Sequence, residues 1–260
     1  MAVDFPDQAQ IVIIGGGVVG CSVAYHLAEL GIKDVVLFER KLLTSGTTWH
    51  AAGLVGQLRA TQNLTRLAQY TTNLYAELEE LTGQATGFRQ NGSLSLATDA
   101  ERFEELKRGA SMASCFGLEV EVVSPKEALD LYPIMSTENL VGAVFLPRDG
   151  QTNPTDTTQA LARGARDKGV RIYEGVTVES FEKEGGRVSA VVTNRGRVAC
   201  ETVVNCAGMW GRALGLKAGV SVPLHAAEHF YVVTEPIPDL PRDLPVVREP
   251  SVCNYYKEDA

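Results

Sequence analysis

Short apolar runs separated by glycines open the chain. A run of mostly β-branched residues at positions 10–14 predicts a strand buried in a parallel sheet. Apolar residues at helical spacing then predict a helix over 18–30 that stops at Gly31. A second apolar run at 34–38 predicts another buried strand. Strand, turn, helix and strand in this order form a βαβ unit and predict an α/β fold.

The middle of the chain lacks this rhythm, whereas the part after residue 154 regains it. Helical patterns cover 64–83, 100–116 and 125–132, and strand patterns cover 92–97 and 142–146. After them come a helix at 156–168, strands at 170–173 and 177–181, and a hairpin over 187–193 and 197–204. We therefore expect a Rossmann-like domain with an inserted α+β domain, built on a mostly antiparallel sheet.

The predicted domain boundaries follow these changes of pattern. We expect the nucleotide-binding domain in two parts, 1–85 and 151–220, and the inserted domain in two parts, 86–150 and 221–260. The last of these parts is expected to be incomplete, because the chain ends in what reads as the middle of a sheet.

The first turn has the residues that a dinucleotide site requires. Gly15 permits a tight turn, Gly17 lets the backbone approach a pyrophosphate, and Gly20 lets the helix lie close to the strand. The helix begins at Val18 and Val19, where its free N–H groups would face the phosphates. Glu39 ends the second strand at the distance expected for an acid that binds ribose hydroxyls, which disfavours a phosphorylated ribose and leaves FAD and NAD as candidates. A glycine-rich turn without any ligand is the weaker alternative.

A loop of small residues surrounds a histidine one βαβ unit later. Its members are Ser45, Gly46, Thr47, Thr48, Trp49, His50, Ala51, Ala52, Gly53 and Leu54. The hydroxyl and backbone N–H groups can bind phosphate and ribose, and a neutral imidazole is a nucleophile. Taken alone, a loop histidine is more often a residue that only forms hydrogen bonds.

Composition and charge exclude several classes of function. The chain has 260 residues, of which 24 are basic and 32 acidic, and its net charge of −8 disfavours a nucleic-acid or membrane partner. Five cysteines without a CxxC pair predict a reducing compartment. With neither an apolar nor an Arg-rich leader in the sequence, we expect a cytoplasmic protein, or one of the mitochondrial matrix if it is eukaryotic and its leader is absent.

His225 and His229 spell an HxxEH pattern, which in a helix would indicate a zinc site. The apolar residues 230–234 that follow predict a strand instead. In a strand, four residues span about 13 Å. One metal ion cannot bridge that distance with bonds of about 2 Å, so we expect no metal site.

A second close approach of the backbone to the dinucleotide is predicted where an apolar strand runs into Asn205, Cys206, Ala207 and Gly208. An ordinary strand end is the alternative for this segment.

Together these residues resemble the sarcosine and dimethylglycine dehydrogenases, within the D-amino-acid-oxidase-like flavoproteins. The matching segments are 15–20, 38–40, 43–54, 149–150, 204–210 and 229–234. The resemblance implies FAD bonded covalently through His50. It also implies cofactor contacts from Arg40, Val178, Ala207, Gly208 and Trp210, besides the turn and loop residues named above.

The resemblance implies oxidative N-demethylation of sarcosine or dimethylglycine, in which a hydride leaves the N-methyl carbon for the flavin. It places His229 near the amine, and a hydroxyl from Tyr255 or Tyr256 beside it. Only one of these tyrosines can face the site if they lie in a strand. Arg59 is a candidate for the substrate carboxylate, and an arginine exposed on the surface is the alternative.

Members of this family are longer, so we expect a truncated chain that is inactive alone. The resemblance implies that the part absent from this chain includes a region that binds tetrahydrofolate. It also implies that the electron acceptor is an electron-transfer flavoprotein or oxygen. Two alternatives remain open: a glycerol-phosphate or D-amino-acid type of flavoenzyme with non-covalent FAD, and a non-catalytic relative.

Overall fold

The computed structural model describes residues 5–258, which form two compact units. Unit 1 comprises the described residues up to Ala51, then Leu78–Thr86 and Pro154–Tyr231. Unit 2 comprises Ala52–Glu77, Gly87–Asn153 and the described residues from Val232 onward. The largest differences from the predicted domains are that residues 52–77 group with unit 2 and that the last change of unit follows Tyr231 rather than residue 220; the other two boundaries differ by one and three residues.

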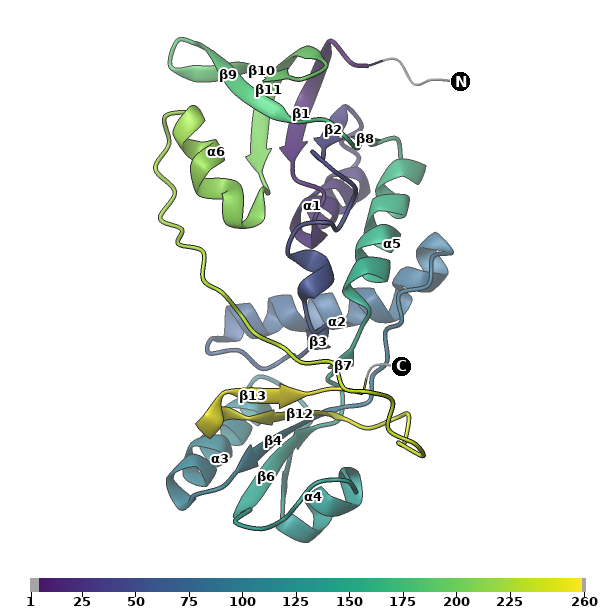
Figure 1. Ribbon diagram of the computed structural model, residues 1–260, viewed down its shortest axis with the longest axis vertical. Helices are drawn as coiled ribbons and strands as arrows, with labels where there is room; N and C mark the ends of the chain where they lie inside the picture. Colours follow the sequence, from purple (N-terminus) through teal and green to yellow (C-terminus); the bar gives the residue numbers. More distant parts are fainter. Residues whose placement is uncertain (1–4, 259–260) are drawn as a thin grey trace. The chain divides into compact units, whose positions relative to one another are not determined.

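Unit 1 is built on a six-stranded sheet in the order β8-β2-β1-β11-β10-β9 (Figure 1). The strands are β1 (Gln8–Ile14), β2 (Val35–Phe38), β8 (Arg171–Tyr173), β9 (Val178–Glu184), β10 (Arg187–Thr193) and β11 (Gly196–Asn205). The first four in the sheet order are parallel, and β10 and β9 continue the sheet as an antiparallel hairpin. Ile13 of β1 lies between Leu37 of β2 and Val204 of β11, and both Ile13 and Leu37 are buried, as expected for a central parallel strand.

Helices α1 (Val18–Glu29) and α5 (Pro154–Asp167) lie side by side in this unit (Figure 1). Gly164 of α5 permits the contact, because a Cβ atom there would lie 2.7 Å from Cε2 of Tyr25 on α1. Short elements complete the unit: the 3₁₀ turns η1 (Thr48–His50) and η2 (Gly208–Trp210), and the helix α6 (Gly211–Lys217).

Unit 2 contains a five-stranded sheet in the order β13-β12-β4-β6-β5 (Figure 1). Its strands are β4 (Ser93–Ala97), β5 (Glu121–Val123), β6 (Gly142–Leu146), β12 (Val246–Glu249) and β13 (Asn254–Tyr256), with the turn η3 (Pro250–Val252) before β13. Only the β12–β4 pair is parallel, which confirms a mostly antiparallel sheet. A separate ribbon pairs β3 (Leu54–Val55) with β7 (Gly150–Gln151). The boundary between the units falls inside α2 (Gln62–Thr82).

The alternation of side chains gives this sheet two differently covered faces. On one face, Leu94, Ala143 and Val247 pack with Ala128 of α4 (Pro125–Leu131). On the other face, Val144 and Leu146 pack against the alanines of α3 (Ala100–Cys115). The α3 face therefore also carries the residues that pair with Val144 and Leu146 on β4, which are Ser95 and Ser93.

The prediction of a strand at 230–234 is wrong. Residues 221–237 form no helix or strand, and more than four-fifths of the surface of Phe230 and of Val232 is exposed. Their apolar, β-branched sequence suits a strand, but a strand needs a hydrogen-bonding neighbour. None of the described strands pairs with this segment.

Among the described helices, none is long and apolar enough to cross a membrane. Within residues 5–258, no group of three or more histidine, cysteine or acidic side chains is arranged to hold a metal ion.

Candidate functional site

The glycines of the first turn are required by space as well as by conformation. Gly15 has φ +113°, and a Cβ atom there would lie 2.3 Å from the carbonyl oxygen of Cys206. A Cβ atom on Gly20 would lie 1.9 Å from the carbonyl oxygen of Gly15. Only glycine at both positions lets β1, α1 and the end of β11 meet this closely.

The start of α1 is in contact with the histidine loop. The N-cap residue of α1, Gly17, makes no side-chain cap, and the Val18 N–H donates instead to Thr48 Oγ1 at 3.0 Å. A Cβ atom on Gly17 would lie 2.9 Å from the same oxygen. The buried Thr48 therefore ties the loop to a helix N-terminus, which has the polarity that a phosphate requires.

Glu39 lies beside the turn, where its carboxylate accepts two backbone hydrogen bonds. The Gly16 N–H donates to Oε2 at 2.7 Å, and the Lys41 N–H donates to Oε1 at 2.8 Å. The carboxylate at the end of β2 thus lies against the glycine turn, as a ribose-binding acid does in a dinucleotide fold.

His50 is exposed at the end of η1 and has two aromatic neighbours. Its ring centroid lies 3.7 Å from that of Trp49, and its Nδ1 lies 3.5 Å from the Tyr231 hydroxyl. In the sequence, His50 is only two residues from Thr48. It therefore belongs to the loop that contacts α1 through Thr48.

The end of β11 makes the second close approach to the turn. The Cys206 N–H donates to the carbonyl oxygen of Ile14 at 2.8 Å, and Asn205 holds the following turn through its amide, which donates to the carbonyl of Gly211. The turn contains Ala207 and Gly208 and ends at Trp210.

Trp210 has a charged neighbour on one ring face. The Arg40 guanidinium lies 4.1 Å from the Trp210 ring centroid, and a Cβ atom on Gly46 would lie 3.5 Å from the same ring. The loop, the Arg40 segment and the end of β11 thus converge in unit 1.

The remaining residues predicted to contact the cofactor lie partly in unit 1 and partly in unit 2. Ser45 closes its own turn by donating to the carbonyl of Leu42, Thr47 is the exposed N-cap residue of η1, and Val19 is exposed on α1. Val178 starts β9 and is buried in the core of unit 1. Ala51 ends the first segment of unit 1, whereas three predicted residues belong to unit 2: Ala52, Gly53 and Leu54.

Unit 2 contains a charged cluster around Arg59. The carboxylate of Asp149 is buried and accepts from the Gln57 N–H at 2.8 Å and from the Ser93 hydroxyl at 2.6 Å. Burial raises the pKa of Asp149, and the hydrogen bonds and the charge of Arg248 oppose this. Burial and the nearby positive charge of Arg248 lower the pKa of Arg59. Arg59 is exposed, so the alternative of a surface arginine stays open, but the charges of Arg248 and Asp149 lie close enough to affect it.

Strand register separates the two candidate tyrosines. Tyr255 lies opposite Arg248, whereas Tyr256 lies opposite Val247, which packs in the core beneath α4. Residues opposite each other in an antiparallel pair project to the same face. Tyr255 therefore shares the face of Arg248, and Tyr256 shares the α4 face, where it contributes to raising the pKa of Tyr132.

His229 lies in the exposed segment of unit 1 that has no regular structure. The sequence analysis missed Arg248, Gln57 and Ser93. The one signal for Arg248 was a charged residue directly after the apolar pair of β12, in a short strand whose first two residues are buried.

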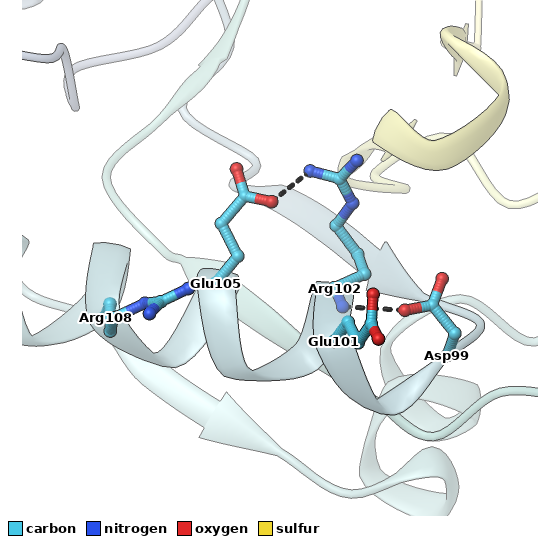
Figure 2. A pocket seen from close by; sticks show the side chains of 5 residues that line it. All are labelled: Asp99, Glu101, Arg102, Glu105 and Arg108. Carbon is cyan, nitrogen blue, oxygen red and sulfur yellow. Dashed lines mark hydrogen bonds and ion pairs between the residues drawn. The ribbon is translucent and has the colours of Figure 1, made fainter.

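A hollow beside α3 does not resemble a binding site. Figure 2 shows that three acidic and two basic side chains line it: Asp99, Glu101, Arg102, Glu105 and Arg108. Arg102 pairs with Glu105, and Asp99 caps the helix by accepting from the Arg102 N–H. Arg102 and Glu105 therefore neutralise each other, and Asp99 is engaged by the backbone of α3.

Curated relatives match almost the whole chain. Human mitochondrial sarcosine dehydrogenase is 43% identical over 258 residues, which is 97% of this chain and 28% of the relative. Mitochondrial dimethylglycine dehydrogenase of Rattus norvegicus is 39% identical and covers 98% of this chain and 30% of the relative. The mitochondrial pyruvate dehydrogenase phosphatase regulatory subunit of Mus musculus is 40% identical over 90% of this chain and 27% of its own. The chain thus spans less than a third of these relatives.

A solved structure has the same fold. L-proline dehydrogenase from P. horikoshii matches with a TM-score of 0.83 at 26% identity, over 94% of this chain and 65% of that one. The family model described as FAD dependent oxidoreductase matches residues 10–259. With the glycine turn, Glu39 and the second backbone approach in place, these matches agree with the geometry, and the chain belongs to the FAD dependent oxidoreductase family.

Proposed function

We propose that this chain is the FAD-binding part of an enzyme that oxidatively demethylates a small N-methyl amino acid. The observation that carries the proposal is the hydrogen bond between the Val18 N–H and Thr48 Oγ1, because it brings the loop of His50 to the N-terminus of the phosphate-binding helix. The relatives named for sarcosine and dimethylglycine support the choice of substrate.

The residues of unit 1 fit FAD. Gly15, Gly17 and Gly20 let the turn pack closely against the end of β11 and Thr48, and such a tight turn suits a pyrophosphate site. Glu39 would hold the ribose hydroxyls, and the ring of His50 would supply the nitrogen for covalent attachment. FAD, when bound, supplies the hydride acceptor.

The residues of unit 2 would bind and orient the substrate. Arg59 would bind its carboxylate, and Tyr255 would present a hydroxyl from the face that it shares with Arg248. His229 would be the further residue near the amine. The nitrogen lone pair forms the C=N bond as the hydride leaves the methyl carbon, and water then releases formaldehyde and the demethylated amine. We propose a mitochondrial location if the source is eukaryotic, as the names of the relatives suggest.

Acid precipitation tests the covalent bond. The protein is expressed with ample riboflavin and precipitated, and the His50→Ala variant is treated in parallel with His225→Ala, which changes another exposed histidine of unit 1. We expect yellow pellets from the unchanged protein and from His225→Ala, and flavin released to the supernatant from His50→Ala. Release from all three would refute the covalent attachment and favour a non-covalent flavoenzyme.

Anaerobic bleaching of the flavin tests the reaction. We expect sarcosine or dimethylglycine to reduce the bound flavin, and trimethylglycine to leave it oxidised because its nitrogen has no lone pair. The similarity to a phosphatase regulatory subunit favours a second candidate, a flavin-binding regulatory protein without turnover. Flavin that is bound but not reduced by any of these amines would support that candidate.

A further inference from the structure

Arg248 projects from β12 onto the same face of the unit 2 sheet as the hydrogen-bonding residues around Asp149. It lies opposite Ser95 of β4 in the parallel pair and opposite Tyr255 of β13 in the antiparallel pair. Ser93, two residues before Ser95, faces the same way and donates to Asp149 Oδ2 at 2.6 Å. Strand geometry therefore brings Arg248, Tyr255 and the surroundings of Asp149 to one face.

Three charged groups converge over Gly56. A Cβ atom on this glycine would lie 3.2 Å from Asp149 Oδ2, 3.6 Å from a terminal nitrogen of Arg59 and 3.8 Å from a terminal nitrogen of Arg248. The φ angle of Gly56 is not positive, so the backbone conformation does not demand glycine here. A side chain at this position would therefore come within 4 Å of both guanidinium groups.

The positive charge of this cluster is not balanced within the protein. Among the residues that the structure describes, no ion pair within 4.0 Å joins Asp149 to either arginine, and the Asp149 oxygens are engaged by Gln57 and Ser93. In the same part of the chain, the buried Nε of Arg248 has no hydrogen-bond partner. Two guanidinium groups and one carboxylate leave an excess positive charge, and such a cluster attracts a small anion.

We propose that Arg248 and Arg59 together bind the carboxylate of the substrate, so that Arg248 decides whether an amine is accepted as a substrate. The inference rests on the proposed function for the identity of the ligand, and the geometry adds a residue to that site. Two guanidinium groups present parallel N–H donors to the two oxygens of a carboxylate. Tyr255, opposite Arg248, then places its hydroxyl next to the bound acid. An amine without a carboxylate lacks this interaction and leaves two like charges close together.

Calorimetric titration with methoxyacetate tests the proposal, because this acid resembles an N-methyl amino acid but has no amine to oxidise. The protein is titrated with and without FAD, so binding is read independently of flavin chemistry. We expect binding of methoxyacetate, at least tenfold weaker binding of the neutral methoxyacetamide, and at least tenfold loss of methoxyacetate affinity in both Arg59→Gln and Arg248→Gln. Arg248→Lys should recover part of the loss, since it restores the charge but not the forked donor.

Arg66→Gln is the matched control, because Arg66 is an exposed arginine of the same unit. It should bind methoxyacetate within twofold of the unchanged protein. Gly56→Ala should weaken binding without removing a charge, because its methyl group would lie within 4 Å of both guanidinium groups, where the carboxylate is proposed to bind. Thermal melting identifies any variant that fails to fold, and the lysine and alanine variants then decide the outcome.

Three results would overturn the proposal. The first is that Arg248→Gln and Arg248→Lys bind methoxyacetate as tightly as the unchanged protein does. The second is equal affinity for methoxyacetate and methoxyacetamide, and the third is tighter binding of inorganic phosphate than of methoxyacetate. Failure of the proposed function looks different. The protein would then acquire no FAD, or hold FAD that sarcosine and dimethylglycine do not reduce, while the calorimetric result stands by itself.

Discussion

The same substitution should have opposite effects in two helices. Gly20→Ala, in α1, places a Cβ atom 1.9 Å from the Gly15 carbonyl oxygen, whereas Gly109→Ala, in α3, places one 3.9 Å from Leu58 Cδ2, an ordinary contact. To reach even 3.0 Å, α1 must move by about 1.1 Å, and overpacking of this kind costs about 1–3 kcal/mol. Gly109→Ala instead gains roughly 0.5–1 kcal/mol, because alanine loses less backbone entropy in a helix.

Urea unfolding followed by far-ultraviolet circular dichroism measures both free energies. The expected order of midpoint concentrations is Gly109→Ala, then the unchanged protein, then Gly20→Ala. Because the proposed function places the FAD phosphates at the N-terminus of α1, Gly20→Ala should also lose most of its FAD affinity, measured by quenching of flavin fluorescence. A midpoint for Gly20→Ala at or above that of the unchanged protein would refute the close approach of α1 to the turn.

Three further predictions concern single side chains. Burial raises the pKa of Cys21 to about 12, so a thiol reagent at pH 8 should leave Cys21 unmodified while it labels the exposed Cys115, as peptide mass mapping will show; labelling at equal rates would contradict the burial of α1. Thr48→Ala removes the acceptor for the Val18 N–H and should lower the free energy of unfolding by about 1 kcal/mol, whereas Thr48→Ser should retain it; equal losses in thermal melts would show that the hydroxyl is not involved. Burial raises the pKa of Asp149 above its ordinary 3.8. The contribution of this group to stability is therefore complete below pH 3.8 and is lost as the pH rises through the raised pKa. Across that pH range Asp149→Asn should gain stability relative to the unchanged protein, and parallel curves of unfolding free energy against pH would contradict the desolvation.

Local spacing was sufficient to predict the glycine turn and most of unit 1. Glycines at 15, 17 and 20 and an acid after the next strand have geometric roles within one βαβ unit, and the structure places Glu39 against the turn, as expected. Most of the predicted helices and strands agree with the observed ones to within a few residues, because their periodicity is strong.

The rest of the candidate site depends on contacts between distant segments. Arg248 became a candidate only because the structure places it near Gly56, almost two hundred residues earlier in the sequence. The pattern of a short strand such as β12 cannot predict that contact. The choice between Tyr255 and Tyr256 needed the register of β12 and β13. Residues 230–234 have the composition of a strand but lack a partner in the described sheets, so propensity alone led to a wrong prediction.

The parallel pairing of β1 with β11 has a consequence for biosynthesis. Gln8 lies beside Ala199, so β1 cannot complete its hydrogen bonds until the chain is synthesised past Asn205. At translation rates of about 5–20 residues per second, this leaves the apolar β1 without one neighbour for about 10–40 seconds. Chaperone binding to nascent chains should therefore persist until late in translation, and the high contact order of this pairing favours slow folding.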